Sequence, residues 1–252
     1  MSGEPDPPEI DPVASARGPA RARIRRFYKQ AAVAETDDGF EVQLDQRPVR
    51  TPGRTRLAVP NRPLAEALAA EWDGQGEWVE PMEMPLTRLV NSALDGVAHA
   101  PGPVADEIVS YAGSDLLCYR AESPAALVER QCAVWDPVLD WAHAALGARF
   151  VLVEGVRFAA QPPGSLAAIA AALPDDPLRL AALNTLTTLS GSALLALAAW
   201  RGALSASEAW RAAHLDEDFQ AEIWGRDSEA EQRRAAHERQ FNAALTLLRL
   251  AD

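Results

Sequence analysis

The chain has 252 residues, enough for one large domain or two smaller ones, each with its own hydrophobic core. Its formal net charge is −12. Because binding to a phosphate backbone requires a basic surface, this charge argues against DNA or RNA as a partner and favours a basic protein surface. Cys118 and Cys132 are the only cysteines, too few for a disulfide framework and outside any zinc-binding spacing, which fits a reducing compartment.

Residues 1–22 are rich in Pro, Ala, Asp and Arg, and are predicted to form a disordered leader. The start is acidic and contains no apolar core segment, so it matches neither a secretory signal nor an Arg-rich transit peptide. We therefore expect the protein in the bacterial cytoplasm. A basic run over residues 17–29 leads into the first strand, and it is either a solvated tail or a docking segment.

Residues 23–103 are predicted to form a small α+β domain that begins with an antiparallel meander of short strands. Phe40, Val42 and Leu44 alternate with polar residues, which is typical of a half-buried strand. The neighbouring signals are, in chain order, a turn at 36–39, a turn at 45–48, a return strand at 49–51 and a further strand at 57–59.

Two helices complete this domain. Asn61 offers an N-cap, Pro63 suits the first helical turn, and the helix is expected to end near Gly74. A second helix is predicted from Leu86 to about residue 95, where apolar residues recur at helical spacing.

Residues 104–252 are predicted to form an all-helical C-terminal domain. The segment 180–200 has no charged residue and is about long enough to cross a bilayer. It also contains seven polar or small residues, which disfavour a lipid-facing helix. We therefore predict no membrane insertion, but a buried central helix with a break at 190–192.

Capping signals predict three helix starts in this domain. Asp136 precedes Pro137, a pair that favours a kink or a new start with Asp136 as the cap. Ser205 and Ser228 are each followed by Glu three residues later, which is the capping-box pattern. Ser228 is expected to open the terminal helix.

The sequence contains no strong pattern for catalysis. It lacks a glycine-rich phosphate loop and a Gly-x-Ser-x-Gly elbow, and its histidines are scattered, so neither a cofactor nor a metal is expected. Pairs of carboxylates keep one alternative open. This alternative is a small acid–base enzyme that uses Asp136, Asp140 or Glu222 in a cleft between the domains.

The segment 216–227 combines acidic and large apolar residues. Its acids surround Phe219, Ile223 and Trp224, and no nucleophile or metal-ligand set lies nearby. Acids early in a helix are favoured by the helix dipole, so a solvated helix end is one interpretation. The other is a surface that binds another protein, because an exposed aromatic side chain lowers solubility unless a partner covers it.

Six short motifs follow one another along the chain. They are DQRPVRTP at 45–52, EWD at 71–73, MPLTRL at 84–89, DLLCYR at 115–120, WDP at 135–137 and FQAEIWG at 219–225. Together they resemble the assembly chaperones that bind the alpha subunit of the F-type ATP synthase catalytic head, a family of mitochondria and some bacteria. The resemblance runs over about residues 26–248.

The resemblance implies an N-terminal α+β domain, a helical C-terminal domain and no catalysis. The partner it implies is the unassembled alpha subunit, whose beta-facing interface the chaperone would shield until the beta subunit displaces it. Organellar relatives would act in the mitochondrial matrix. We expect a monomer. The expected partner-binding residues are Glu222 first, then Asp227, with Phe219, Trp224, Gln220, Asp216 and Asp218 in support.

Overall fold

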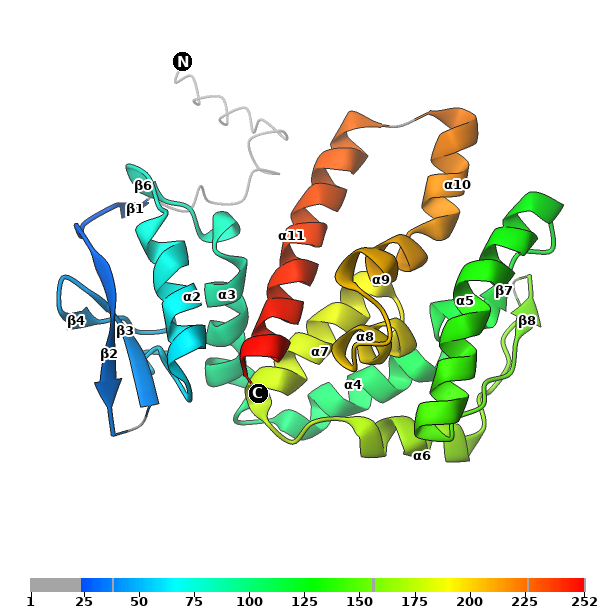
Figure 1. Ribbon diagram of the computed structural model, residues 1–252, viewed down its shortest axis with the longest axis horizontal. Coiled ribbons are helices and arrows are strands. Elements are labelled where there is room, and N and C mark those ends of the chain that lie inside the picture. Colours follow the sequence, from blue (N-terminus) through cyan, green and yellow to red (C-terminus); the bar gives the residue numbers. More distant parts are fainter. Residues whose placement is uncertain (1–23, 38, 156, 226, 252) are drawn as a thin grey trace, which may run out of the picture.

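A small sheet with covering helices lies at one end of the molecule, and a larger helical body lies at the other (Figure 1). The computed structural model describes residues 24–37, 39–155, 157–225 and 227–251. The strands are β1 (Ile24–Arg25), β2 (Ala31–Thr36), β3 (Gly39–Leu44), β4 (Arg47–Pro48), β5 (Ala58–Val59), β6 (Trp78–Val79), β7 (Tyr119–Arg120) and β8 (Val153–Glu154). The helices are α2 (Arg62–Asp73), α3 (Pro85–Ser92), α4 (Pro101–Gly113), α5 (Ala125–Leu146), α6 (Pro163–Ala172), α7 (Pro177–Ser190), α8 (Ala193–Trp200), α9 (Ala206–Ala213), α10 (Leu215–Trp224) and α11 (Ser228–Leu250), with the short turns η1 (Pro81–Glu83), η2 (Ala93–Val97) and η3 (Leu116–Cys118).

The N-terminal sheet is the predicted antiparallel meander. Strand β3 pairs with β2, β4 and β5 in antiparallel register. Val42 and Leu44 are buried, as the alternation of apolar residues predicts. Gly39 begins β3 with φ +115°, and a Cβ there would lie 2.5 Å from the Val59 carbonyl oxygen, so this position requires glycine.

Helix α2 has the predicted cap and end, and it covers the sheet. Asn61 Oδ1 accepts a hydrogen bond from Leu64 N at 3.0 Å, and Gly74 caps the other end. The apolar face of α2, including Leu64 and Leu68, is buried against β2 and β3. Together with α3, this arrangement confirms the α+β class of the fold.

Helix α7 occupies the centre of the helical body, where it contacts α4, α8 and α11. The predicted break is confirmed, because α7 ends at Ser190, Gly191 has φ +68°, and the Ser192 side chain caps α8 by accepting from Leu195 N at 3.0 Å. Seven of the eight residues of α8 are buried. Within the described residues, we find no helix with both the length and the apolar character needed to cross a membrane.

The N-terminal and C-terminal parts share one continuous hydrophobic core. Helix α11 packs against α7 and also against α2 and α3. The Asn61 side chain, which caps α2, also donates from Nδ2 to the Leu250 carbonyl oxygen at 2.5 Å. Helix α4 begins near the predicted boundary at residue 103, but the division into two domains stays a prediction. The predicted leader, residues 1–22, lies outside the described residues.

The predicted new helix start at Asp136 is wrong. Helix α5 runs from 125 to 146 with Pro137 inside it. A proline removes one backbone hydrogen bond, but the buried face of α5 continues across it through Trp135 and Val138. Asp136 is therefore not a cap. Its Oδ1 accepts from Arg120 Nη2 at 2.8 Å.

Two smaller predictions also need correction. The return strand lies at Arg47–Pro48 instead of 49–51, because Asp45 and Gln46 both have positive φ and form a two-residue turn. The cap of α11 is Asp227, whose Oδ1 accepts from Glu229 N at 3.0 Å, and not Ser228. The capping box at Ser205 is confirmed.

Candidate partner-binding site

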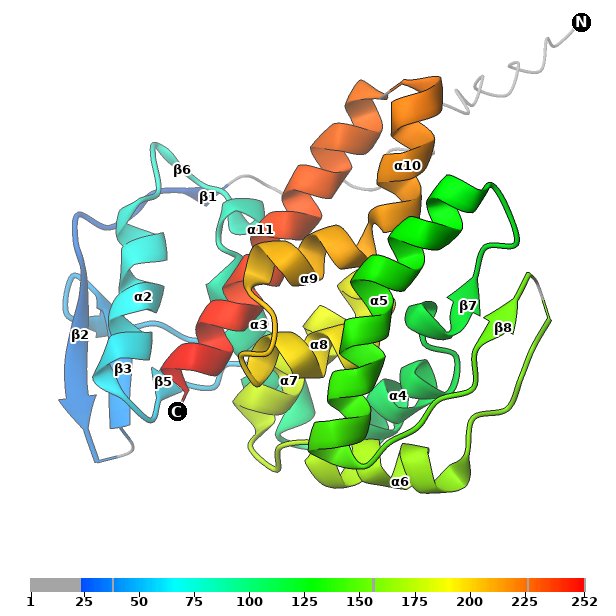
Figure 2. The same cartoon turned by 45° about the vertical axis from the view of Figure 1, so that its right-hand side comes forward.

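Helices α10 and α11 form an antiparallel hairpin that rises beyond the rest of the helical body (Figures 1 and 2). Helix α10 ends at Trp224, and Gly225 follows with φ +89°. Helix α11 then returns toward the core. Its residues 228–240 are mostly exposed, whereas its C-terminal part is largely buried from Phe241 onward. The tip of the hairpin is therefore surrounded by solvent.

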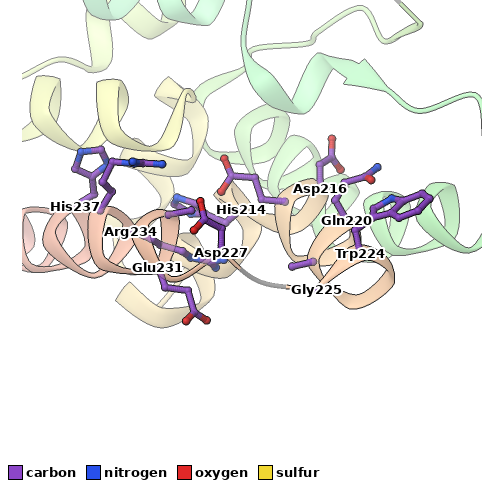
Figure 3. Close-up of a pocket in the computed structure, with 13 residues that line it drawn as sticks. His214, Asp216, Gln220, Trp224, Gly225, Asp227, Glu231, Arg234 and His237 are labelled. Carbon is purple, nitrogen blue, oxygen red and sulfur yellow. The ribbon is translucent and has the colours of Figure 1, made fainter.

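A groove of about 670 Å³ lies between the two helices (Figure 3). It is lined by His214, Asp216, Glu217, Gln220, Ala221, Trp224, Gly225, Asp227, Ala230, Glu231, Arg233, Arg234 and His237. Four of the predicted residues, Asp216, Gln220, Trp224 and Asp227, meet in this groove. Trp224 is 82% exposed and its neighbour Ile223 is 55% exposed. The tip therefore presents two large apolar side chains beside carboxylates.

One histidine is fixed at the base of this groove. His214 is buried, its ring centroid lies 3.9 Å from that of Trp210, and its Nδ1 lies 2.8 Å from the Trp210 carbonyl oxygen. Because a carbonyl oxygen only accepts, Nδ1 carries the proton in this contact. His214 thus anchors the start of α10 on α9.

Charged and amide side chains tie α10 to α5 and α11. Arg130 on α5 donates from both terminal nitrogens to the two carboxylate oxygens of Glu222, each at 2.7 Å. This contact raises the pKa of the Arg130 guanidinium above its ordinary value. Arg234 of α11 donates to both oxygens of Asp218, with an Nη2–Oδ2 distance of 2.9 Å. Asp216 Oδ1 accepts from Gln131 Nε2 at 2.8 Å.

Phe219 is the one buried member of the predicted set. Only 7% of it is exposed, and the Arg130 guanidinium lies 5.2 Å from its ring centroid. Asp218 and Glu222 line a second groove of about 540 Å³ between α10, α5 and α9. The predicted residues thus lie on α10, except for Asp227, which caps α11, and Phe219 is the one that is buried.

Sequence reasoning missed the arginines that pair with the acids of α10. Arg130 lies 92 residues before Glu222, and Arg234 lies 16 residues after Asp218. Neither spacing is a local helical one, so a single sequence carries no signal for these pairs. It also missed His214 and His237 as groove residues.

The carboxylates proposed for acid–base chemistry do not form one site. Asp136 pairs with Arg120, Asp140 is exposed one turn farther along α5, and Glu222 pairs with Arg130. A pocket of about 230 Å³ lies between α3 and α7, where the two parts of the chain meet. Among the described residues, its lining contains no Asp, Glu or His. No group of three or more potential metal ligands occurs in the described ranges.

A fully buried carboxylate belongs to Asp115. Its oxygens accept from Ser192 Oγ at 2.7 Å and from the amides of Leu117 and Leu194 at 3.1 Å each. Burial raises the pKa of Asp115 to about 6, although these hydrogen bonds act in the opposite direction. Since Asp115 binds the first turn of α8, its role is to hold the α7–α8 junction.

Known proteins match this chain in sequence and fold. Residues 25–143 match the model of the ATP12 chaperone protein family. The Atu1473 protein from Agrobacterium tumefaciens is 48% identical, with coverage of 97% of this chain and 92% of that chain and a TM-score of 0.89. Atp12 from Paracoccus denitrificans is 41% identical, with coverage of 91% and 99% and a TM-score of 0.85. A mutant of the Paracoccus protein is 40% identical, with coverage of 91% and 98% and a TM-score of 0.83. The chain therefore belongs to the ATP12 chaperone family.

Proposed function

We propose that this protein is an assembly chaperone of the F-type ATP synthase catalytic head. It binds the unassembled alpha subunit and shields its beta-facing interface until the beta subunit displaces it. The surface of the α10–α11 hairpin makes the contact. The proposal rests on membership of the ATP12 chaperone family and on the side chains that the hairpin exposes.

The exposure of Trp224 carries this proposal. Its side chain is 82% exposed at the hairpin tip, next to the 55% exposed Ile223. Tryptophan is enriched among the residues that dominate binding energy, and water around such a large apolar surface is unfavourable. Carboxylates of the first turn of α10 lie on the same helix. An apolar anchor flanked by acids suits a partner that combines apolar and basic side chains.

The affinity of such a chaperone has an upper limit. A specific contact buries roughly 1,600 Å² in total, but the chaperone must release alpha to beta. An interface with charged flanks and few anchors forms quickly through electrostatic attraction and can dissociate quickly. The mixed surface of the hairpin fits this requirement.

The same proposal covers the remaining expectations. The protein works as a monomer, without a cofactor, a nucleic acid or a chemical step. It acts where the catalytic head is assembled, which is the bacterial cytoplasm, or the mitochondrial matrix for organellar relatives.

The test is a titration of purified alpha subunit with this protein and two single variants. Trp224→Ser should raise the Kd by about tenfold or more, because it removes the exposed anchor. Phe158→Ser is the matched control, since Phe158 is 76% exposed but belongs to the extended segment between β8 and α6. This control should bind alpha as the wild type does.

The results test the identity of the partner and the location of the contact surface independently. Equal affinity of Trp224→Ser and wild type would rule out the hairpin tip as the contact. A wild-type protein that binds beta, or neither subunit, would rule out alpha as the client. Addition of the beta subunit to the complex should release the chaperone. A chaperone that stays bound to alpha would contradict the proposed displacement by beta.

A further inference from the structure

Arg130 occupies a site with the features of an arginine-binding site. Its two terminal nitrogens bond to the two oxygens of Glu222, at 2.7 Å each. Its guanidinium carbon lies 5.2 Å from the centroid of the Phe219 ring. A carboxylate that binds both nitrogens and an aromatic face that stacks on the guanidinium are the two contacts that distinguish arginine from lysine.

The ion pair at this site is open to solvent. The side chains of Arg130 and Glu222 are 47% and 54% exposed, so water and ions reach both partners and weaken their attraction. The second pair on α10, between Asp218 and Arg234, is less exposed, at 29% and 27%. Of these two ion pairs, the one with Arg130 is therefore more open to competition by an external guanidinium.

The surroundings also leave room for a peptide segment. Glu222 and Arg130 lie at the second groove, of about 540 Å³, whose lining includes the partly exposed apolar residues Val134 and Leu204. A segment that places an arginine on Glu222 could place an apolar neighbour against Val134. Charge and apolar lining thus favour one kind of occupant, an arginine next to an apolar side chain.

We propose that Arg130 is an internal substitute for an arginine of the client. In the free chaperone it occupies the site formed by Glu222 and Phe219, and an arginine of the client displaces it on binding. The inference rests on the proposed function, because it assumes that α10 contacts the client. Arg130 then lowers the apparent affinity, since only molecules in which it has swung away can bind the client arginine. Such competition keeps the complex transient.

The first test uses three variants in the titration with purified alpha subunit. Arg130→Ala removes the competitor and should tighten binding by about two- to fivefold, the range set by an exposed ion pair. Glu222→Gln keeps the shape of the side chain but loses the charge, and should weaken binding. The double variant Arg130→Glu with Glu222→Arg keeps an ion pair with reversed polarity. Its thermal stability should stay near that of the wild type, but alpha binding should be lost.

A purely structural role for Arg130 predicts the opposite pattern. Arg130→Ala would then weaken binding in parallel with a lower melting temperature, and the double variant would restore both properties. Either result would overturn the inference while leaving alpha as the client of the wild-type protein.

A second measurement does not depend on alpha. In a ¹⁵N NMR titration, the side-chain Nε–Hε signal that is missing in Arg130→Ala should shift when N-acetyl-arginine amide is added. Equal amounts of N-acetyl-lysine amide should shift it much less, because lysine cannot form the paired contact. A shift without alpha binding would support the exchange and reject the proposed client. No shift with arginine would overturn the inference even if alpha binds.

Discussion

The two cysteines occupy contrasting environments. Cys118 is fully buried in η3, where burial and the nearby negative charge of Asp115 raise the pKa of its thiol to about 12. Cys132 is exposed on α5, and its Sγ lies 4.0 Å from Arg120 Nη1. Because the thiolate is the reactive form, the two thiols should differ strongly in reactivity.

We predict that one thiol per folded chain reacts rapidly with a disulfide reagent such as DTNB. The reactive thiol should be that of Cys132, and Cys132→Ser should abolish the rapid phase. Both thiols of the wild type should react after unfolding in guanidinium. Two rapid thiols in the native protein would mean that Cys118 is accessible.

At the scale of single residues, the sequence predicted where a side chain lies in its own helix better than which distant residues it contacts. The acids of 216–218 do lie in the first turn of a helix, because this preference is local and follows from the helix dipole. Phe219 lies against Arg130 of α5, which is distant in sequence, whereas Trp224 is 82% exposed. No local rule could therefore separate the buried ring from the exposed one.

At the scale of elements, the junction between α7 and α8 depends on Asp115. The buried carboxylate accepts hydrogen bonds from Ser192 and from the first turn of α8, and its pKa rises from an ordinary value of 3.8 to about 6. The folded protein therefore binds a proton more tightly at this site than the unfolded chain does. The stability contributed by this group is fully present below pH 3.8 and is lost as the pH rises through about 6.

We predict a pH-dependent difference between the wild type and Asp115→Asn. Between pH 4 and pH 7 the wild type should lose up to about 3 kcal/mol of unfolding free energy relative to the variant, whose side chain does not titrate. Urea unfolding at the two pH values measures this change. The other carboxylates titrate alike in both proteins, so their effects cancel in the comparison. A constant difference between the two proteins would show that Asp115 is charged throughout this range.

Several elements were predictable because their signals are local. Asn61 and Ser205 are caps, and the break at 190–192 follows from small residues and a glycine with positive φ. Pro137 misled the prediction, because the tertiary contacts of Trp135 and Val138 keep α5 continuous. Packing outweighs a local helix breaker in this case.

At the scale of the whole molecule, α11 connects the three main parts of the structure. Its buried C-terminal part packs against α7 in the helical body and against α3 beside the sheet. Its N-terminal part forms one side of the exposed hairpin. The capping pattern at Ser228 indicated where this helix begins, but not that its N-terminal half extends into solvent while the part from Phe241 onward is buried. That division depends on where the neighbouring helices end.

We predict a gradient of hydrogen exchange along this single helix. Amides of residues 228–240 have few buried contacts and should exchange about tenfold faster or more than those of 241–250, because local opening is less costly where little apolar surface is buried. Mass spectrometry of peptides from the two halves gives the rates, with α7 as the slowly exchanging reference. Bound alpha subunit should slow exchange in 215–225 and 228–240 and leave 241–250 unchanged. Uniform protection along α11 in the free protein would instead indicate a rigid hairpin, and the partner would then find its contact surface already in place.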